Sequence, residues 1–457
     1  MLKILIDLLP AHGHFHAILK IAFKLKNDGY NVIFGSHLSM QKEIEKYGFL
    51  FVELPDVPVT KVNFAVRLSK QNKFITYFYW FLSREKYRKS KKDVSVFHNA
   101  IHLIKPDLIL LDEQVAIKAF LYEMIDFPVV VFQTKPDTRK INGIPPFTSF
   151  YLPNGKLTRE IYSNFLWFAK LLKYKFIYLY NRILSSGQDN YSILKKIGKD
   201  YNIDMNKRIE IKRSFGVGIK GLSRFIISPA AFDFPHPEKE QVYRIGPLID
   251  IKRDGNILDA RYSSLLARIE AMKKDKNGFI VYCSLGTISS NFKKEVTKFF
   301  KKMVQVSKSN TDCLFILSTG KDFNINDLYP IPDNLFVFDF VPQVNLLNYC
   351  DLMITHGGMN SITECVYNDV PMLIYPLSLK WDQPGNSARA VFHGLGLRGK
   401  IKKDSVKMIS KKLIRIKSNH VFYKKNVIEM KKKFEEKNQS DELLQIIDNM
   451  LTNFNSL

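Results

Sequence analysis

A chain of 457 residues is long enough for two domains with separate cores, and its apolar content of 46% is ordinary for a globular protein. The net charge of +25 comes from dispersed Lys and Arg without a nucleic-acid recognition motif, so the sequence argues against a nucleic-acid partner. No run reaches the ~18 consecutive apolar residues of a membrane span, and residues 1–7 include an early acid and fit a first strand better than a signal peptide.

The first elements predict a βαβ unit. Residues 4–8 form a short apolar run that predicts a strand, and residues 15–26 carry a broad apolar face at helical spacing. Asn27-Asp-Gly29 ends that helix, because glycine suits a left-handed C-terminal cap. Further strands are predicted at residues 32–34, 108–111 and 129–132. A βαβ opening implies a parallel sheet with buried strands.

The second half repeats the alternation of strand and helix after residues 243–247, which are typical of an interdomain connection. Apolar runs predict its strands at residues 279–284, 314–317, 335–338, 352–354 and 372–375. The predicted fold class is α/β, with two doubly wound domains at residues 1–240 and 241–457 that face each other across a cleft. The last helical segment, residues 441–451, could pack back on the first domain.

All four cysteines lie in the second half of the chain. They are Cys283, Cys313, Cys350 and Cys365. They form no CxxC pair, and several of them stand in an apolar context. This pattern indicates reduced structural thiols and predicts a cytoplasmic protein.

Two segments combine aromatic and basic residues, one at about residues 64–92 and the other at residues 162–184. Three interpretations stay open. The segments could be ordinary helices that cover the sheet, they could line a pocket for an apolar substrate, or they could lie at an anionic lipid surface. The pocket interpretation rests on four aromatic residues: Phe74, Phe78, Trp80 and Trp167.

A candidate catalytic pair follows two of the predicted strands. His14 stands in the turn after the first strand, and Asp112 ends the strand at residues 108–111, so both should face the same cleft. A carboxylate bonded to one imidazole nitrogen makes the other nitrogen a base near neutral pH, able to deprotonate a hydroxyl. His12 and His16 are the local alternatives, and either His14 or Asp112 could instead only cap or pack a helix.

The turn Thr355–Ser361 (Thr-His-Gly-Gly-Met-Asn-Ser) follows a strand and leads into a helical segment. A glycine-rich turn before a helix directs free backbone N–H groups and a positive dipole end toward an anion. The side chains of His356, Asn360 and Ser361 add donors. The turn therefore predicts a phosphate or pyrophosphate site.

Residues around this turn predict a nucleotide-sugar site. Phe340, at the end of a strand, could stack on a base, while the backbone beside it could contact the edge of the base. Glu364 could accept hydrogen bonds from ribose hydroxyls, and Asp382-Gln383 could bind sugar hydroxyls. Each residue also has a simpler structural interpretation. Phe340 could close an apolar strand, Glu364 could be a solvated or packed helix residue, and Asp382 could cap a helix.

The order of these motifs resembles the donor-binding signature of the UDP-glycosyltransferase superfamily, in particular bacterial macrolide and flavonoid glycosyltransferases. The residues that carry the likeness are Phe340-x-Pro-Gln343, Thr355–Ser361, Glu364, Val370-Pro371, Pro376, Asp382-Gln383 and Asn386. Pro10-Ala-His-Gly-His14, Asp112, Gly246-Pro247 and Tyr282–Thr287 match other landmarks of that family, so the resemblance spans nearly the whole chain. It implies a GT-B fold, with an N-terminal acceptor-binding and a C-terminal donor-binding domain.

The resemblance also implies a role for each matching residue. His14 would be the general base of an inverting transfer and Asp112 would orient it. The donor, a UDP-hexose such as UDP-glucose, would contact Thr134, Gly286, Thr287, Phe340, Val341, Gln343, His356, Gly358, Asn360, Ser361, Glu364, Asp382 and Gln383. The acceptor would be a hydrophobic molecule with a hydroxyl, bound by the four aromatic residues named above.

Two departures from the family pattern concern the sugar and the first helix. The spacing between Pro376 and Asp382 is about two residues longer than usual, which weakens the assignment of glucose, and Ala17 replaces a usual proline. No DxD motif is present, so a divalent metal ion is not expected to be essential. No cofactor is expected, and the UDP-sugar would be a co-substrate. Two other functions remain: a peripheral-membrane glycosyltransferase with a lipid, sterol or carotenoid acceptor, and a non-catalytic binder of nucleotide sugars or nucleic acid.

Overall fold

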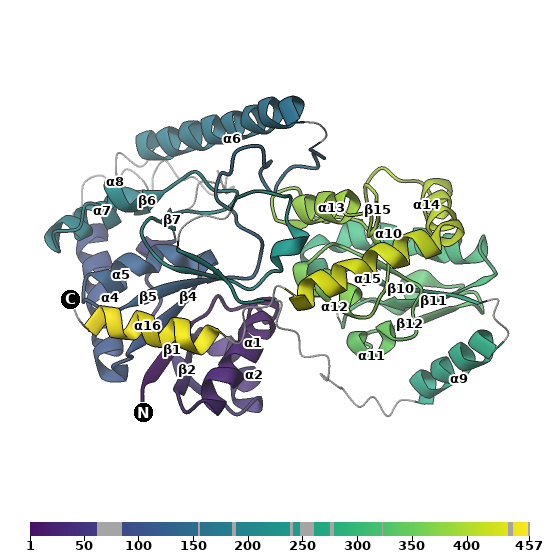
Figure 1. The fold of residues 1–457 in the computed structure, drawn as a ribbon, viewed down its shortest axis with the longest axis horizontal. Helices are drawn as coiled ribbons and strands as arrows, with labels where there is room; N and C mark the ends of the chain where they lie inside the picture. Colours follow the sequence, from purple (N-terminus) through teal and green to yellow (C-terminus); the bar gives the residue numbers. More distant parts are fainter. Residues whose placement is uncertain are drawn as a thin grey trace.

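The computed structural model describes residues 1–61, 85–153, 156–184, 189–237, 241–246, 260–274, 278–321, 323–436 and 442–455. Its described strands form two parallel sheets, one in each half of the chain, and a short antiparallel pair. Figure 1 shows the two sheets side by side, with the N-terminal half on the left and the C-terminal half on the right.

The first sheet has seven strands in the order β3-β2-β1-β4-β5-β8-β9. The strands are β1 (Lys3–Asp7), β2 (Asn31–Ser36), β3 (Leu50–Glu53), β4 (Leu108–Asp112), β5 (Val129–Gln133), β8 (Arg224–Ile226) and β9 (Val242–Arg244). The helices of this half are α1 (His12–Asn27), α2 (Gln41–Lys46), α4 (Glu85–Ile104), α5 (Ala119–Glu123), α6 (Lys156–Leu184), α7 (Asn190–Asp200) and α8 (Met205–Arg208). The antiparallel pair is β6 (Ile209–Glu210) with β7 (Gly218–Ile219).

The second sheet has six strands in the order β12-β11-β10-β13-β14-β15. They are β10 (Phe279–Ser284), β11 (Cys313–Ser318), β12 (Leu335–Phe338), β13 (Leu352–Thr355), β14 (Met372–Ile374) and β15 (Gly396–Arg398). The helices are α9 (Ala260–Lys274), α10 (Lys293–Lys308), α11 (Gln343–Leu347), α12 (Met359–Tyr367), α13 (Gln383–Phe392), α14 (Val406–Ser418), α15 (His420–Glu436) and α16 (Leu443–Asn455).

The sequence explains why these strands are central. All five residues of β4 are buried, since helices cover both faces of a parallel sheet and only an unbroken apolar run can fill such a strand. Helix α1 directs Phe15, Ile18 and Ala22 into the core and is followed by Gly29, which has φ +90° as its cap position requires. The predicted α/β class with two doubly wound units is confirmed.

Each sheet has one point, called its switch point, where the strand order reverses direction. In the first sheet it lies between β1 and β4, and in the second between β10 and β13. Loops that follow the two strands diverge there, which leaves a crevice outside the carboxyl ends of the strands where ligands bind in open α/β sheets. The predicted site residues His14, Asp112, Gly286 and His356 follow or end these four strands.

The boundary between the halves differs in detail from the expected connection. Tyr243 and Arg244, expected in the linker, form part of β9, so the first sheet extends a few residues past residue 240. The last helix, α16, leaves the second half and lies along the first, where Leu443, Ile447 and Leu451 enter the core beside Ile4 (Figure 1).

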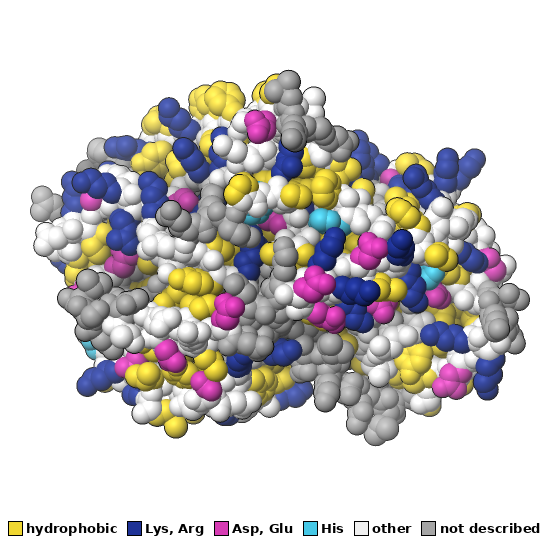
Figure 2. All heavy atoms as spheres, in the orientation of Figure 1, with side chains coloured by type: hydrophobic (Ala, Val, Ile, Leu, Met, Phe, Trp, Pro, Cys, Tyr) yellow, Lys and Arg dark blue, Asp and Glu magenta, His cyan; other side chains and the backbone are white. Residues whose placement is uncertain are grey.

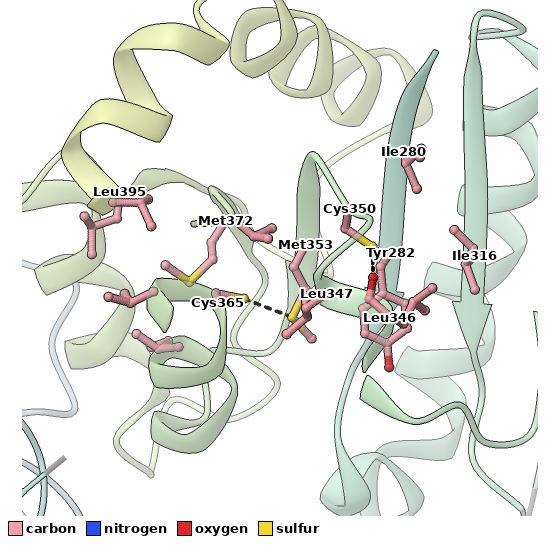
Figure 3. Close-up of a cluster of buried hydrophobic side chains, with 14 of the residues drawn as sticks. Ile280, Tyr282, Ile316, Leu346, Leu347, Cys350, Met353, Cys365, Met372 and Leu395 are labelled. Carbon is pink, nitrogen blue, oxygen red and sulfur yellow. Dashed lines mark hydrogen bonds between the residues drawn. The ribbon is translucent and has the colours of Figure 1, made fainter. Parts of the chain in front are cut away.

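The core beneath the second sheet contains the cysteines. Figure 3 shows Cys350 and Cys365 among apolar side chains, where Cys365 Sγ lies 3.2 Å from the sulfur of Met353. All four cysteines are buried and free of disulfides. Burial raises the pKa of each thiol, to about 12 for Cys313, so the thiols stay protonated and pack as small apolar groups. Among the described helices, none is long and apolar enough to cross a membrane.

Candidate active site

The structure joins the two predicted catalytic residues. Nδ1 of His14, in the first turn of α1, lies 2.7 Å from Oδ2 of Asp112 at the end of β4. The strands β1 and β4 are neighbours in the sheet, so residues 98 positions apart in sequence meet at its carboxyl edge. The His14 side chain is 17% exposed and Asp112 is buried. The arrangement leaves Nε2 of His14 as the ring nitrogen not bonded to Asp112.

The Asp112 carboxylate is held in its ionised form. Burial alone raises the pKa of this carboxyl, but His14, the backbone N–H of Gln114 and Lys135 outweigh burial and hold the pKa below its ordinary value. Gln114 donates to Oδ1 at 2.9 Å, and the backbone N–H of Leu9 donates to Oδ2 at 3.3 Å. A fixed, charged acceptor on Nδ1 keeps the proton there and Nε2 available as a base.

The two alternative histidines face a different carboxylate. Nε2 of His16 lies 2.9 Å from Oε1 of Glu43 on α2, and His12 pairs with the same carboxylate. Neither contacts Asp112 in the described structure. Of the three histidines in this loop, His14 is therefore the one with the geometry of a carboxylate-oriented base.

In the second half, His356 fills the gap between two glycines. A Cβ atom on Gly286 would lie 2.4 Å from Cε1 of His356, and one on Gly358 would lie 2.6 Å from Nε2. Gly286 also has φ +72° and Gly357 has φ +86°, values that favour glycine. The loops after β10 and β13 can approach each other this closely because neither glycine carries a side chain.

The imidazole of His356 is uncharged at neutral pH. Burial lowers its pKa to about 4, against a smaller opposing effect from Asp382. Its Nδ1 is buried and makes no hydrogen bond within the described part of the chain. A neutral imidazole with one free nitrogen can donate a single hydrogen bond to an anion that enters the turn.

Helix α12 begins at this turn. Its cap residue, Gly358, has extended backbone angles, and no side chain caps the helix end, so the first N–H groups are left for another acceptor. Asn360 extends from the first turn toward the other half of the chain, and its Nδ2 donates to the carbonyl of Gly13 at 3.1 Å. The turn Thr355–Ser361, called the anion turn below, is therefore in direct contact with the segment that carries His14.

A hydrogen-bonded group lies beside the start of α12. Gln343 donates through Nε2 to the carboxylate of Glu364 and to Ser361 Oγ at 3.3 Å, and it accepts from Tyr282 OH at 3.3 Å. Glu364 is buried, so the amide both satisfies and orients the carboxylate. Phe340 is 59% exposed, which leaves its ring face open for stacking. The side chain of Val341 packs in the core instead.

The side chains of Asp382 and Gln383 make different contacts. Gln383 is buried and its Oε1 accepts from the backbone N–H groups of Leu377 at 2.7 Å and Ser378 at 3.1 Å, so its carbonyl holds the loop after β14 in place. Asp382 is half-buried and accepts from Asn386 Nδ2 at 3.0 Å. The same amide donates to the carbonyl of Gly357, which sets Asp382 beside the anion turn.

The structure gives fewer contacts for the other residues that the sequence predicts at the site. Thr134 is half-buried and follows β5, at the carboxyl edge of the first sheet. Thr287 begins the short helical turn after Gly286, and its side chain lies outside the description. Phe74, Phe78 and Trp80 lie outside the described residues.

Trp167 does not offer a surface to a ligand in this structure. It is 1% exposed, and its Nε1 donates to the carbonyl of Ile144 at 2.7 Å. The expectation that Trp167 lines an acceptor pocket is therefore corrected, because the indole fastens α6 to the body of the first half. Spacing could not distinguish an inward from an outward aromatic residue on this helix, because aromatic residues occur on both its buried and its exposed sides.

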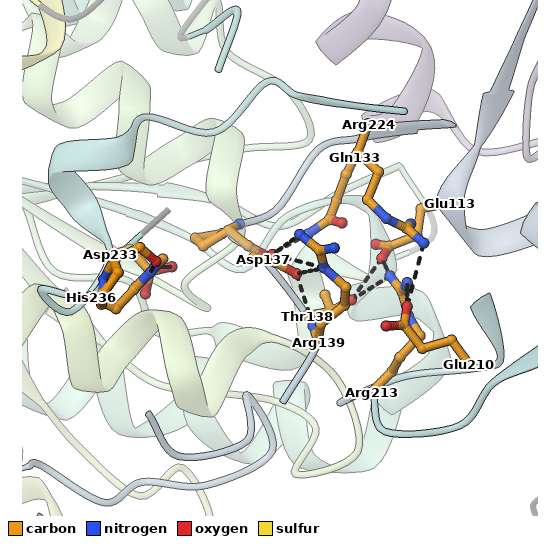
Figure 4. Close-up of polar contacts among 12 residues, drawn as sticks. Glu113, Gln133, Asp137, Thr138, Arg139, Glu210, Arg213, Arg224, Asp233 and His236 are labelled. Carbon is orange, nitrogen blue, oxygen red and sulfur yellow. Dashed lines mark hydrogen bonds and ion pairs between the residues drawn. The ribbon is translucent and has the colours of Figure 1, made fainter. Parts of the chain in front are cut away.

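Sequence reasoning missed a buried ionic group directly behind Asp112. Figure 4 shows Glu113 between Thr138 and Arg213, with Glu210 and Arg224 beyond. Thr138 Oγ1 donates to Glu113 at 2.6 Å, Arg213 pairs with Glu113, and Arg213 Nη1 lies 2.9 Å from Glu210. These residues are far apart in the chain and match no motif, so no sequence signal could have found them. They link the segments that follow β4 and β5 to β6 and β8.

A second contact group, also missed, joins the two halves. Arg389 of α13 is fully buried, donates from Nε to Asp233 at 2.8 Å and lies 3.8 Å over the ring of Phe147. The backbone N–H of Gly385 donates to the carbonyl of Phe147 at 2.7 Å. Among the described residues, no cluster of three or more His, Cys, Asp or Glu side chains could hold a metal ion.

Parts of the chain match a known protein family and known sequences. Residues 305–450 match the family described as erythromycin biosynthesis protein CIII-like, C-terminal domain. The uncharacterized UDP-glucosyltransferase YojK of Bacillus subtilis (strain 168) is 28% identical over 190 residues, which cover 41% of this chain and 42% of YojK. The aligned part thus spans less than half the length of that relative.

Solved structures align over nearly the whole chain. The glycosyltransferase of kitacinnamycin has a TM-score of 0.66 at 16% identity, covering 98% of each chain. The calicheamicin glycosyltransferase CalG4 has a TM-score of 0.65 at 16% identity, covering 99% of each chain. These likenesses show the GT-B fold, with two Rossmann-like domains facing each other. The family match over residues 305–450 and the partial match to YojK support the resemblance to the UDP-glycosyltransferase superfamily.

Proposed function

We propose that the protein is an inverting, metal-independent glycosyltransferase that moves a hexose from a UDP-sugar to a hydroxyl of a hydrophobic small molecule. The observation that carries the proposal is the direct contact between the two switch-point loops. Nδ2 of Asn360, on the helix that follows the anion turn, bonds the carbonyl of Gly13, next to the base candidate His14. A diphosphate at one loop would therefore lie near a base at the other.

The donor would bind at the carboxyl edge of the second sheet. The free N–H groups at the start of α12 and the neutral imidazole of His356 would contact the pyrophosphate. Phe340 would stack on the base, and Glu364, oriented by Gln343, would accept from the ribose hydroxyls. Asp382 would contact the sugar, while Gln383 would support the loop that carries it.

The transfer follows from these positions. Nε2 of His14 accepts the proton of the acceptor hydroxyl, and the oxygen attacks the anomeric carbon from the face opposite UDP. The bond from that carbon to the diphosphate oxygen breaks, and UDP leaves with the electron pair. Asp112 stabilises the imidazolium, and the helix N-terminus stabilises the charge on the departing diphosphate. Proximity of donor and acceptor between two domains lowers the barrier by several kcal/mol.

Binding followed by turnover tests the proposal. UDP and TDP, then a panel of their sugars, are screened for a rise in melting temperature, and stabilising donors are assayed with hydroxylated apolar acceptors. We expect His14→Ala to reduce transfer by about 10²–10⁴-fold while leaving UDP stabilisation intact. His102→Ala, an exposed histidine of α4, is the matched control. Full transfer activity in folded His14→Ala would refute the assignment of the base, and EDTA-sensitive transfer would refute metal independence.

A further inference from the structure

Helix α6 is oriented with its apolar side outward. Seven large apolar side chains, three or four residues apart, form one exposed stripe: Ile161, Phe165, Phe168, Leu172, Phe176, Leu179 and Ile183. The most exposed of the three phenylalanines, Phe168 and Phe176, are each 63% accessible. At 1.5 Å per residue this stripe runs for roughly 33 Å. Figure 1 shows α6 as the outermost layer of the first half.

The inward side of α6 is instead attached through polar groups. Ser163 Oγ donates to the carbonyl of Gly143 at 3.2 Å, Trp167 Nε1 donates to Ile144, and Lys170 Nζ donates to Thr148 Oγ1 at 3.1 Å. Tyr174 OH donates to the carbonyl of Ser214 at 3.3 Å. A surface helix ordinarily buries its apolar stripe. These bonds hold α6 in the opposite orientation, so its stripe, with the flanking Tyr162 and Tyr180, is a large exposed apolar surface of the kind that marks an interaction site.

Basic residues border the stripe on both sides. Lys173 lies along one edge of the exposed face and Lys175 and Arg182 lie along the other, and all three are exposed. Figure 2 shows yellow apolar side chains mixed with dark blue basic ones along the upper edge of the molecule, where α6 lies. Long basic side chains beside an apolar stripe can reach lipid phosphates while the stripe enters the acyl region.

A lipid surface fits this face better than a second copy of the chain. In a coiled coil the buried positions repeat every 3.5 residues on average. If that repeat is continued from residues 161, 165, 168 and 172, Lys175 and Arg182 fall at buried positions. A paired copy would bring these charges against identical ones, and each copy carries +25. The apolar residues follow the helical period of 3.6 instead, which produces a straight stripe suited to a flat surface.

We propose that α6 is a membrane-surface anchor that lies in the headgroup region of an anionic bilayer, with its apolar stripe inserted and its basic borders on lipid phosphates. The helix lies on the membrane and does not span it, in keeping with the absence of a spanning helix from the described part of the chain. The anchor would hold the first domain at the surface from which apolar molecules are taken. It does not depend on the proposed transfer reaction.

Vesicle co-sedimentation of the full chain tests the apolar stripe. We expect the protein to bind vesicles of 70% phosphatidylcholine and 30% phosphatidylglycerol, and Phe165→Gln/Phe168→Gln/Leu172→Gln to weaken that binding roughly tenfold or more. Glutamine preserves helix propensity, and the side chains are exposed, so the variant should keep its melting temperature. Val421→Gln/Phe422→Gln, exposed on α15 in the other half, should bind as the unmodified protein does. Equal binding by all three proteins would overturn the proposal.

The charge borders give a second, independent measurement. Lys173→Gln/Lys175→Gln/Arg182→Gln should lose roughly fivefold in affinity per residue for the anionic vesicles and become less sensitive to salt. Lys407→Gln/Lys411→Gln/Arg415→Gln, exposed on α14, removes the same charge from the other half and should have a small effect. Equal losses in both triple variants would mean that overall charge alone binds the vesicle, which contradicts the anchor. Sedimentation of a lipid-free dimer that the apolar variant converts to a monomer, without vesicle binding, would also overturn it.

Discussion

The amide of Asn360 and the carbonyl of Gly13 are joined by a hydrogen bond of 3.1 Å between residues 347 positions apart in the chain. Asn360 stands in the first turn of α12, and Gly13 immediately precedes His14. The bond therefore connects the switch point of the second sheet with that of the first, beside the proposed base.

Asn360→Ala should lower kcat for transfer about tenfold, the worth of one hydrogen bond that positions the two loops. Because the contact is exposed, the melting temperature should hardly change. Steady-state kinetics with a saturating donor measures the effect. Asn348→Ala is the control and should keep its rate, because the Asn348 amide donates to carbonyls of α11, the helix that Asn348 caps. An unchanged kcat in Asn360→Ala would show that the contact plays no part in positioning.

Asp112→Asn should reduce transfer by about 10²–10⁴-fold at neutral pH, because an amide can no longer stabilise the imidazolium of His14. The pKa of Asp112 lies below its ordinary value, so the carboxylate is charged at any pH above about 4, and the loss should be the same from pH 6 to 8. Asp107→Asn, at the opposite end of β4, is the control, since Asp107 bonds only the backbone of Lys3. Equal activity of the two variants would contradict the pairing.

His356 should make stability depend on pH below neutrality. Burial lowers its pKa to about 4, while the unfolded chain takes up the proton near 6.5, so the unfolded state binds more protons between these values. The contribution is fully present above pH 6.5 and is lost as pH falls toward 4, by about 3 kcal/mol at 1.36 kcal/mol per pKa unit. Urea unfolding from pH 4 to 7 should show a steeper slope for the unmodified protein than for His356→Asn. Matching slopes would mean that the pKa of His356 is the same in the folded and unfolded states.

Gly286→Ala should cost more than left-handed strain alone. Gly286 and Gly320 both have positive φ, +72° and +87°, but a Cβ on Gly320 would meet nothing within 4 Å whereas one on Gly286 would overlap His356. We expect Gly320→Ala to lower the free energy of unfolding by about 1 kcal/mol. Gly286→Ala should lose a further ~1–3 kcal/mol and lose UDP-dependent stabilisation. Similar values for both would show that the histidine moves aside freely.

Arg389→Met should destabilise the contact between the halves by about 3–5 kcal/mol, because it leaves the carboxylate of Asp233 buried without its partner. Burial by itself raises the pKa of Asp233, but Arg389 and His236 outweigh it and hold the pKa below its ordinary value. Asp233→Asn/Arg389→Met should recover part of the loss, since no unpaired charge remains. Urea unfolding compares the two. A double variant as unstable as the single one would indicate that stacking on Phe147, rather than charge, is the main interaction.

Much of the fold and part of the site could be predicted from local pattern. Buried parallel strands need unbroken apolar runs, so β4 and β10 were visible in sequence, and the glycine at residue 29 marked a helix end. The positions of His14 and Asp112 after two predicted strands indicated a shared edge of the sheet. Arg389, Asp233 and Phe147 gave no such signal, because their partners are set by the packing of two domains and not by spacing.

The amino-acid sequence by itself indicated the α/β class, the resemblance to UDP-glycosyltransferases and the turn from His356 to Ser361, because periodicity and short motifs record local structure. Tertiary structure decided which histidine meets Asp112, that the carbonyl of Gln383 supports a loop, and that Trp167 faces inward while Phe168 faces out. The physical reason is that burial and hydrogen-bond partners depend on which elements pack together. The local sequence around two aromatic residues of one helix does not show which side of that helix will be buried.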